Sequence, residues 1–191
     1  MSENDVKNIG LRGVTVADSK ISKVDGINGR LIYRGYKIQD LAKETTFEEI
    51  VYLLLMGRLP TADELSETRQ IMAKERPLPV EVINMLKARA TNADPMDVLQ
   101  SAVAALSDSD PDLQSQEREN RVKSALRLIS RTASVIAAWY HIKDGNEPDA
   151  ADTTLSHAGA FLKGLWKKDP SAQETKLMDV LLVLHAEHTF N

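Results

Sequence analysis

The chain has 191 residues, of which 42% are hydrophobic and 27% charged, which is the balance of a folded domain with a sizeable core. Its formal net charge of -4 argues against a nucleic-acid-binding surface and a polybasic membrane anchor, because both require a basic field. The sequence contains no cysteine, which excludes disulfides, thiolate zinc sites and a cysteine nucleophile.

The first part of the chain, residues 1–35, is predicted to be an extended, β-rich segment. Its first ten residues are polar and lack the apolar stretch of a secretory signal, so we expect a cytoplasmic protein. Short β-branched runs predict strands near Ile21–Val24 and Arg30–Tyr33. The dipeptides Asp25-Gly26 and Asn28-Gly29 between them suit turns that need positive φ.

From residue 36 to residue 191 the pattern is helical. Two capping boxes, Thr46 with Glu49 and Thr61 with Glu64, predict helix starts, and Gly57 predicts the end of the first helix. Further helices are expected from Pro79 to about Ala90, after the cap Asp94-Pro95, over Leu155–Trp166 and from about Ser171. The sequence therefore predicts an all-α protein with a short β-rich beginning.

The longest predicted helix covers Arg121–Asp144, after a polar linker at residues 107–112. Its apolar residues recur at spacings of three and four, which predicts one continuous buried stripe. The members of this stripe are Val122, Ala125, Leu126, Ile129, Ala133, Ile136, Ala137 and Tyr140.

The most chemically suggestive stretch is LHAEHTFN, residues 184–191, which holds His185 and His188 near the end of the last predicted helix. An imidazole that leaves water needs a hydrogen-bond partner or a ligand. The two rings could be core histidines bonded to backbone carbonyls, metal ligands, or donors to a substrate carbonyl or carboxylate. Their spacing alone does not choose among these interpretations, although it lacks the arrangement of a His-Glu-x-x-His zinc motif.

Several segments together resemble prokaryotic citrate synthases. The stretch from Val24 to Thr61 contains VDGINGRLIYRGYKIQDL and FEEIVYLLLMGRLPT, which are similar to the family's phrases in that region. The segments LPVEVINMLK, DPMDVLQSAVAAL, LSHAGAFL and MDVLLVLHAEHTFN follow in the family's order. The resemblance implies a citrate-synthase-like large domain, mostly helical and incomplete, of which this chain is the N-terminal part.

The resemblance also implies an activity. Citrate synthases are acyltransferases of the tricarboxylic acid cycle that join acetyl-CoA to oxaloacetate, giving citrate and CoA, with no bound cofactor and no metal. On this basis His188 and Asn191 are expected to bind oxaloacetate, and His185 to support them. The family's other catalytic histidines, its aspartate, its arginines and its small domain belong to later sequence, so the chain alone is predicted to be inactive.

Three other functions stay open at this point: a 2-methylcitrate synthase, a relative of citryl-CoA lyase, and a non-catalytic helical scaffold. Asp94, Ala160 and Thr189 depart from the residues that many relatives carry, which weakens any inference about substrate preference. The partners implied are oxaloacetate, an acyl-CoA, a second copy in a homodimer and a separate C-terminal half. The helix over Arg121–Asp144 and the terminal helix are the expected dimer interface.

Three other residues are given structural roles. His157 is expected to be a packed or capping histidine rather than a catalytic one. His141 suits a favourable contact with the carbonyl end of its helix. Arg34 is expected to make an ion pair or to tether the backbone.

Overall fold

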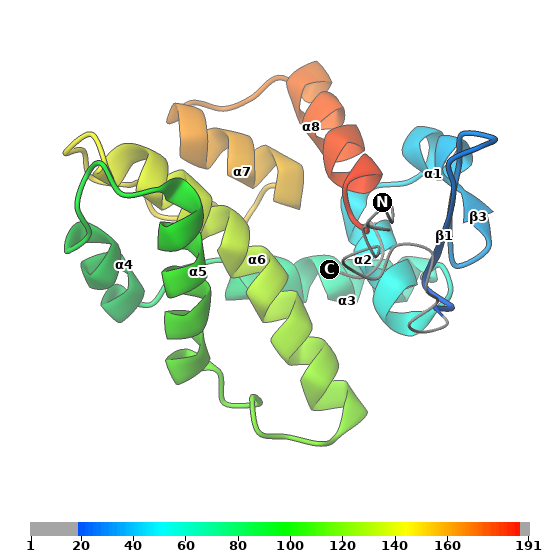
Figure 1. The fold of residues 1–191 in the computed structure, drawn as a ribbon, viewed down its shortest axis with the longest axis horizontal. Coiled ribbons are helices and arrows are strands. Elements are labelled where there is room, and N and C mark those ends of the chain that lie inside the picture. Colours follow the sequence, from blue (N-terminus) through cyan, green and yellow to red (C-terminus); the bar gives the residue numbers. More distant parts are fainter. Residues whose placement is uncertain (1–18, 188–191) are drawn as a thin grey trace, which may run out of the picture.

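The computed structural model describes residues 19–187, and Figure 1 shows their arrangement. The chain begins with a three-stranded antiparallel sheet in the order β1-β2-β3. Strand β1 covers Ser22–Asp25, β2 covers Arg30–Tyr33, and β3 covers Tyr36–Lys37. The first two strands confirm the predicted pair. The third was not predicted; it forms because Arg34 and Gly35 take positive φ values of 47° and 95° and reverse the chain.

Eight α-helices follow within the described residues: α1 Ile38–Glu44, α2 Phe47–Met56, α3 Ala62–Glu75, α4 Val80–Lys87, α5 Pro95–Leu106, α6 Arg118–Ile142, α7 His157–Trp166 and α8 Ala172–Leu184. A short 3-10 turn, Ser107–Ser109, lies in the linker that precedes α6. The fold is therefore mostly helical with a small sheet, as predicted.

The predicted helix signals act as expected. The side chain of Glu49 accepts the Thr46 backbone N–H at 2.8 Å, and Asp94 accepts the Met96 N–H at 2.8 Å. Gly57 ends α2 in the left-handed conformation, with φ of 88°. Pro79 differs from the prediction, because it caps α4 instead of lying in its first turn.

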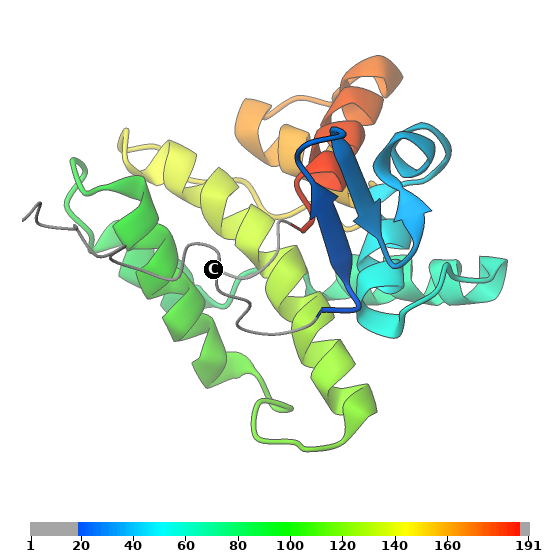
Figure 2. The ribbon, with the colours of Figure 1, turned by 45° about the vertical axis from the view of Figure 1, so that its right-hand side comes forward.

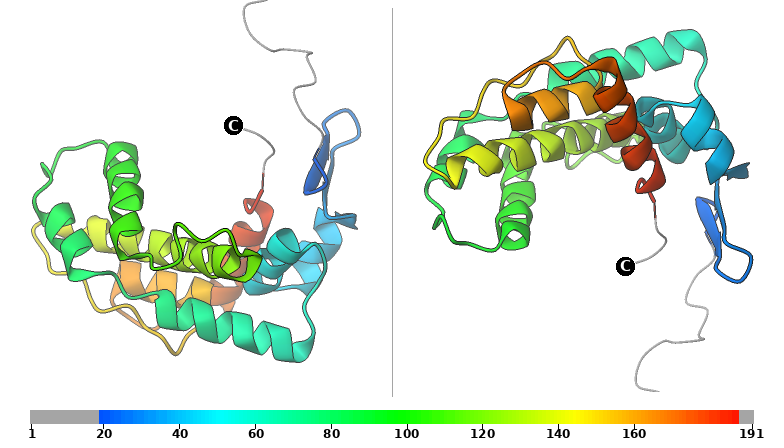
Figure 3. Two further views of the ribbon diagram at one scale, coloured as in Figure 1. Left: turned by 90° about the horizontal axis from the view of Figure 1, so that it is seen from below. Right: turned by 90° about the horizontal axis from the view of Figure 1, so that it is seen from above.

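Helix α6 joins two hydrophobic clusters. The first cluster combines α1, α2, α3 and α8 with Leu126 of α6, and the second combines α4 and α5 with the C-terminal half of α6. Helix α7 lies alongside α6 in both views of Figure 3. A long helix with neighbours on several sides cannot bury a single stripe.

The predicted stripe on α6 is wrong at two positions of its second half for this reason, although Ala137 is buried as predicted. Ile136 and Tyr140 are 40% and 50% exposed. Val135 and Trp139 are buried in their place, against α4 and α5. The buried face therefore shifts round the helix where the neighbouring elements change.

Polar contacts also connect these elements. The Arg127 guanidinium on α6 contacts Glu75 at the end of α3 and Asp110 in the linker, and its own side chain is 10% exposed. Arg131, one turn later, donates to the Glu75 backbone carbonyl at 3.1 Å. A buried cation needs such partners, so this network fixes the linker and α3 against α6.

Helix α8 packs through a narrow face. Val183 and Asp179 are buried, whereas Leu177, Leu181 and Leu184 are 63%, 41% and 39% exposed. The described part of the chain therefore carries an apolar row on the outer side of α8. None of the helices between residues 19 and 187 is long and apolar enough to cross a membrane.

Candidate functional site

The predicted site lies at the C-terminal end of α8. His185 follows the last helical residue, its side chain is exposed, and its Nδ1 lies 2.7 Å from the Leu181 carbonyl oxygen. His188, Thr189 and Asn191 are outside the described residues. The structure therefore places His185, one of the three predicted residues, and the turn at residues 184–187 that leads to the other two; this turn is called the approach to the site below.

A buried tyrosine from the small sheet holds this approach. Tyr33 on β2 is 0% exposed, and its hydroxyl contacts the backbone on both sides of His185. Its oxygen lies 3.3 Å from the Leu184 carbonyl and 3.0 Å from the Glu187 carbonyl, and it lies 3.3 Å from the Glu187 backbone nitrogen. Figure 2 shows the sheet beside the end of α8. Burial raises the pKa of the Tyr33 hydroxyl, so it stays a neutral donor and acceptor.

The start of α2 is fixed by α8 in a second contact. Asp179 is 5% exposed, and its Oδ1 accepts the Phe47 backbone N–H at 2.9 Å. A carboxylate at a helix N-terminus satisfies a free N–H and faces the positive end of the helix dipole. Burial nevertheless raises the pKa of Asp179, because the charged form loses water. Tyr33 thus ties the C-terminal end of α8 to the sheet, and Asp179 ties the middle of α8 to the start of α2.

His157 is a packed histidine, as predicted. It is 4% exposed, and its ring centroid lies 5.1 Å from that of Phe47. Its backbone N–H donates to Glu48 Oε1 at 2.8 Å. Burial, with help from the nearby Arg76 cation, lowers the pKa of the imidazole from 6.5 to about 4. His157 is therefore neutral at physiological pH.

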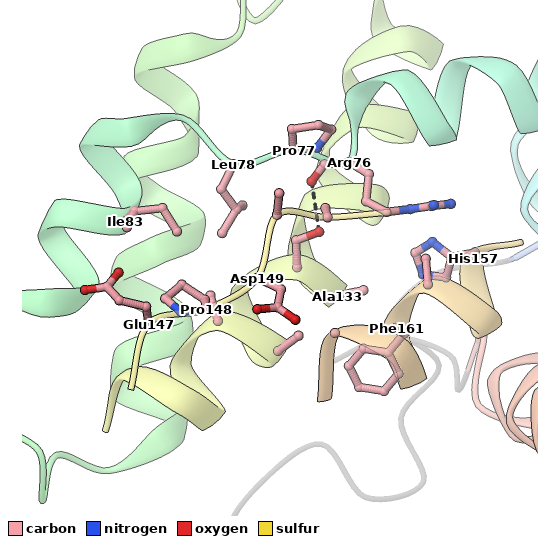
Figure 4. Close-up of a pocket in the computed structure, with 17 residues that line it drawn as sticks. Arg76, Pro77, Leu78, Ile83, Ala133, Glu147, Pro148, Asp149, His157 and Phe161 are labelled. Atoms are coloured by element: carbon pink, nitrogen blue, oxygen red, sulfur yellow. Dashed lines mark hydrogen bonds between the residues drawn. The ribbon is translucent and has the colours of Figure 1, made fainter. Parts of the chain in front are cut away.

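A cavity of about 360 Å³ lies beside His157, between α6, α7 and the loop before α7. Figure 4 shows Arg76 and His157 at one end, Phe161 below them, and Glu147 and Asp149 on the loop. The rest of the lining is mostly apolar. The Arg76 Nη1 donates to the Asp152 and Leu155 carbonyls, and Ser134 Oγ donates to the Arg76 carbonyl at 2.8 Å.

His185, the described residue of the predicted site, does not line this cavity. The cavity's two buried polar side chains, Arg76 and His157, have nitrogen atoms without a hydrogen-bond partner in the described structure, but these atoms are sealed from solvent. Ala160 lines the same cavity. The cavity therefore offers a ligand an apolar wall and little directional polarity.

Arg34 has its expected role, whereas the contact that His141 makes is with the neighbouring helix α7 and not, as was predicted, with the end of its own helix. Arg34 tethers the backbone, since it donates to the Leu54 carbonyl at 2.7 Å and to the Lys20 carbonyl at 3.4 Å. His141 lies in the last turn of α6, with Nε2 2.9 Å from the Gly164 carbonyl oxygen. Between residues 19 and 187, no three histidine, aspartate or glutamate side chains are grouped so as to hold a metal ion.

Tyr33, Asp179 and Glu48 were not predicted from the sequence to have a role at the site. A tyrosine in a short strand has no pattern that reveals a contact more than 150 positions away. The two carboxylates lie within helices, where aspartate and glutamate usually face water. Their hydrogen bonds to the Phe47 and His157 N–H groups show that they cap other helices.

Comparisons with known proteins support one family. The family model described as "Citrate synthase, C-terminal domain" matches residues 10–191. The citrate synthase of Synechocystis sp. is 37% identical over 191 residues, which are 100% of this chain and 48% of that protein. The chain thus spans about half the length of the curated relatives it matches.

Two solved structures have the same fold. The crystal structure of citrate synthase from Pyrobaculum aerophilum matches with a TM-score of 0.88 and 33% identity, over 93% of this chain and 46% of that one. The ternary complex of carboxymethyl coenzyme A and oxaloacetate with the citrate synthase of Thermoplasma acidophilum matches with a TM-score of 0.85 and 25% identity, over 94% and 47%. The helical fold, the order of the motifs and the family match over residues 10–191 together show that the chain belongs to the citrate synthase family.

Proposed function

We propose that this chain provides the oxaloacetate-binding portion of a citrate-forming synthase that uses acetyl-CoA as its second substrate. His188 and Asn191 would hydrogen-bond oxaloacetate, and His185 would support them. The observation that carries the proposal is the family match, which runs through these residues to position 191. The related Thermoplasma enzyme, described as a complex with oxaloacetate and a CoA derivative, supports the substrate class.

The chemistry of these side chains fits a small dicarboxylate. An imidazole N–H and a carboxamide N–H are directional donors to a ketone or carboxylate oxygen. Donors fixed in place stabilise negative charge on such an oxygen at no cost of reorganisation. Citrate formation requires neither a metal nor a prosthetic group on this proposal. Removal of a proton from the acetyl group is assigned to residues that this chain does not contain.

The proposal includes the assembly. We propose that residues 1–35 form the β-rich beginning and residues 36–191 the helical part of a large domain, in a cytoplasmic homodimer. The small domain would be provided by further sequence. The exposed row Leu177, Leu181 and Leu184 on α8 supports burial against another surface.

Two measurements on purified chain test the proposal. Calorimetry should show saturable binding of oxaloacetate that His188→Ala weakens by about tenfold or more, equivalent to about 1.4 kcal/mol. Release of CoA from acetyl-CoA and oxaloacetate should be absent with this chain and appear when the family's remaining half is added as a second polypeptide.

The outcomes separate the rival functions. Release of CoA by the chain alone would contradict the predicted inactivity. Absence of oxaloacetate binding would instead favour the non-catalytic scaffold. A preference for propionyl-CoA in the reconstituted assay would indicate a 2-methylcitrate synthase, and cleavage of citryl-CoA would indicate the lyase.

A further inference from the structure

One side chain of the small sheet contacts the turn that carries the predicted site. The Tyr33 hydroxyl reaches Leu184 and Glu187, and these two residues bracket His185. The contact uses both capacities of the hydroxyl, since it donates to a carbonyl and accepts the Glu187 N–H at 3.3 Å. The turn therefore has its backbone fixed on both sides of His185.

The sheet holds Tyr33 in turn. Tyr33 is 0% exposed and packs in the cluster that contains Leu41, Ile50 and Val183. In the antiparallel register it pairs with Ser22 on β1 and with Tyr36 on β3. A side chain with its ring buried and its strand paired on both sides has little freedom to move its hydroxyl.

From these contacts we infer that Tyr33 is a positioning residue for the oxaloacetate site, through its hydrogen bonds to the turn Leu184–Glu187. This inference rests on the proposed function. His185 lies between the two residues that the hydroxyl contacts, so fixing their backbone limits how far the His185 imidazole can move. Without the hydroxyl the ring still fills the core, but the turn loses its cross-chain anchor.

The test replaces the hydroxyl alone. Tyr33→Phe keeps the buried ring, and Tyr36→Phe removes a hydroxyl from the neighbouring tyrosine of the same sheet, which is 41% exposed. Ser130→Ala is the control for lost stability, because its buried hydroxyl bonds only within α6, to the Leu126 carbonyl at 2.8 Å. All three variants are compared with the unmodified chain in oxaloacetate calorimetry. Nitrogen NMR reports the His185 ring and the exchange of the Glu187 amide.

The expected result is specific to one variant. Tyr33→Phe should weaken oxaloacetate binding by about tenfold, speed exchange of the Glu187 amide and change the His185 ring signals. Tyr36→Phe and Ser130→Ala should bind within about twofold of the unmodified chain.

Each contrary result has a distinct meaning. Unchanged affinity in Tyr33→Phe would overturn the inference and leave the proposed function standing. Equal weakening in Ser130→Ala would also overturn it, because the effect would then come from lost stability. No binding by the unmodified chain would overturn the proposed function, and the inference would fall with it.

Discussion

Mild acid should destabilise this protein through His157. The imidazole is 4% exposed and faces the Phe47 ring, the Glu48 carboxylate and the Arg76 guanidinium. The unfolded chain takes up a proton at this residue near pH 6.5, whereas in the folded protein burial lowers its pKa to about 4. Between these values the unfolded state binds more protons, so stability is complete above pH 6.5 and is lost as the pH falls.

The size of the effect follows from the two pKa values. The difference between 6.5 and about 4 corresponds to about 3 kcal/mol, because a difference of one in pKa is about 1.4 kcal/mol. Roughly 2 kcal/mol of this should already be lost at pH 5. A typical domain has about 5–15 kcal/mol of stability, so the loss is readily measured.

Urea unfolding at pH values from 7.5 to 5 provides the assay. In the His157→Gln variant the slope of stability against pH should be smaller by as much as about 1.4 kcal/mol per pH unit over the lower part of this range. The variant can lose packing against Phe47, but that loss is the same at each pH. Ser130→Ala serves as a control that lowers stability without removing a titratable group. An unchanged slope in His157→Gln would refute the reasoning.

Two further predictions concern α8. Asp179→Ala removes the acceptor of the Phe47 N–H and should lower the free energy of unfolding, measured in urea titrations, by about 1–3 kcal/mol. Asp179→Asn should lower it less, because the amide oxygen can still accept this hydrogen bond; equal losses in the two variants would contradict the capping role. Light scattering at micromolar concentration should show a dimer or a larger assembly, and a stable monomer of the unmodified chain would contradict this prediction. Leu181→Asp should dissociate the assembly without unfolding the chain, because Leu181 is 41% exposed.

Local signals in the sequence determined the elements and most of their boundaries. The capping boxes at Thr46 and Thr61, the Asp94 cap and Gly57 satisfy backbone groups within a few residues, so they act alike in any tertiary setting. The family resemblance, carried by motifs in order along the chain, is likewise a property of the sequence. It was confirmed by the match over residues 10–191.

The face that each helix buries was decided by its neighbours. The apolar spacing on α6 predicted one stripe, yet Ile136 and Tyr140 are exposed and Trp139 is buried, because the first and second halves of the helix meet different clusters. Periodicity describes one side of a cylinder, whereas a helix of 25 residues has neighbours on several sides.

The approach to the predicted site was also decided by tertiary structure. His185 could be chosen from the sequence because its motif is local, but Tyr33, which anchors the backbone on both sides of it, lies 151 positions from Leu184 in the chain. The same is true of Asp179, which caps a helix that begins 132 positions earlier. Hydrogen bonds between distant segments depend on how the whole core packs, and no short stretch of sequence contains that information.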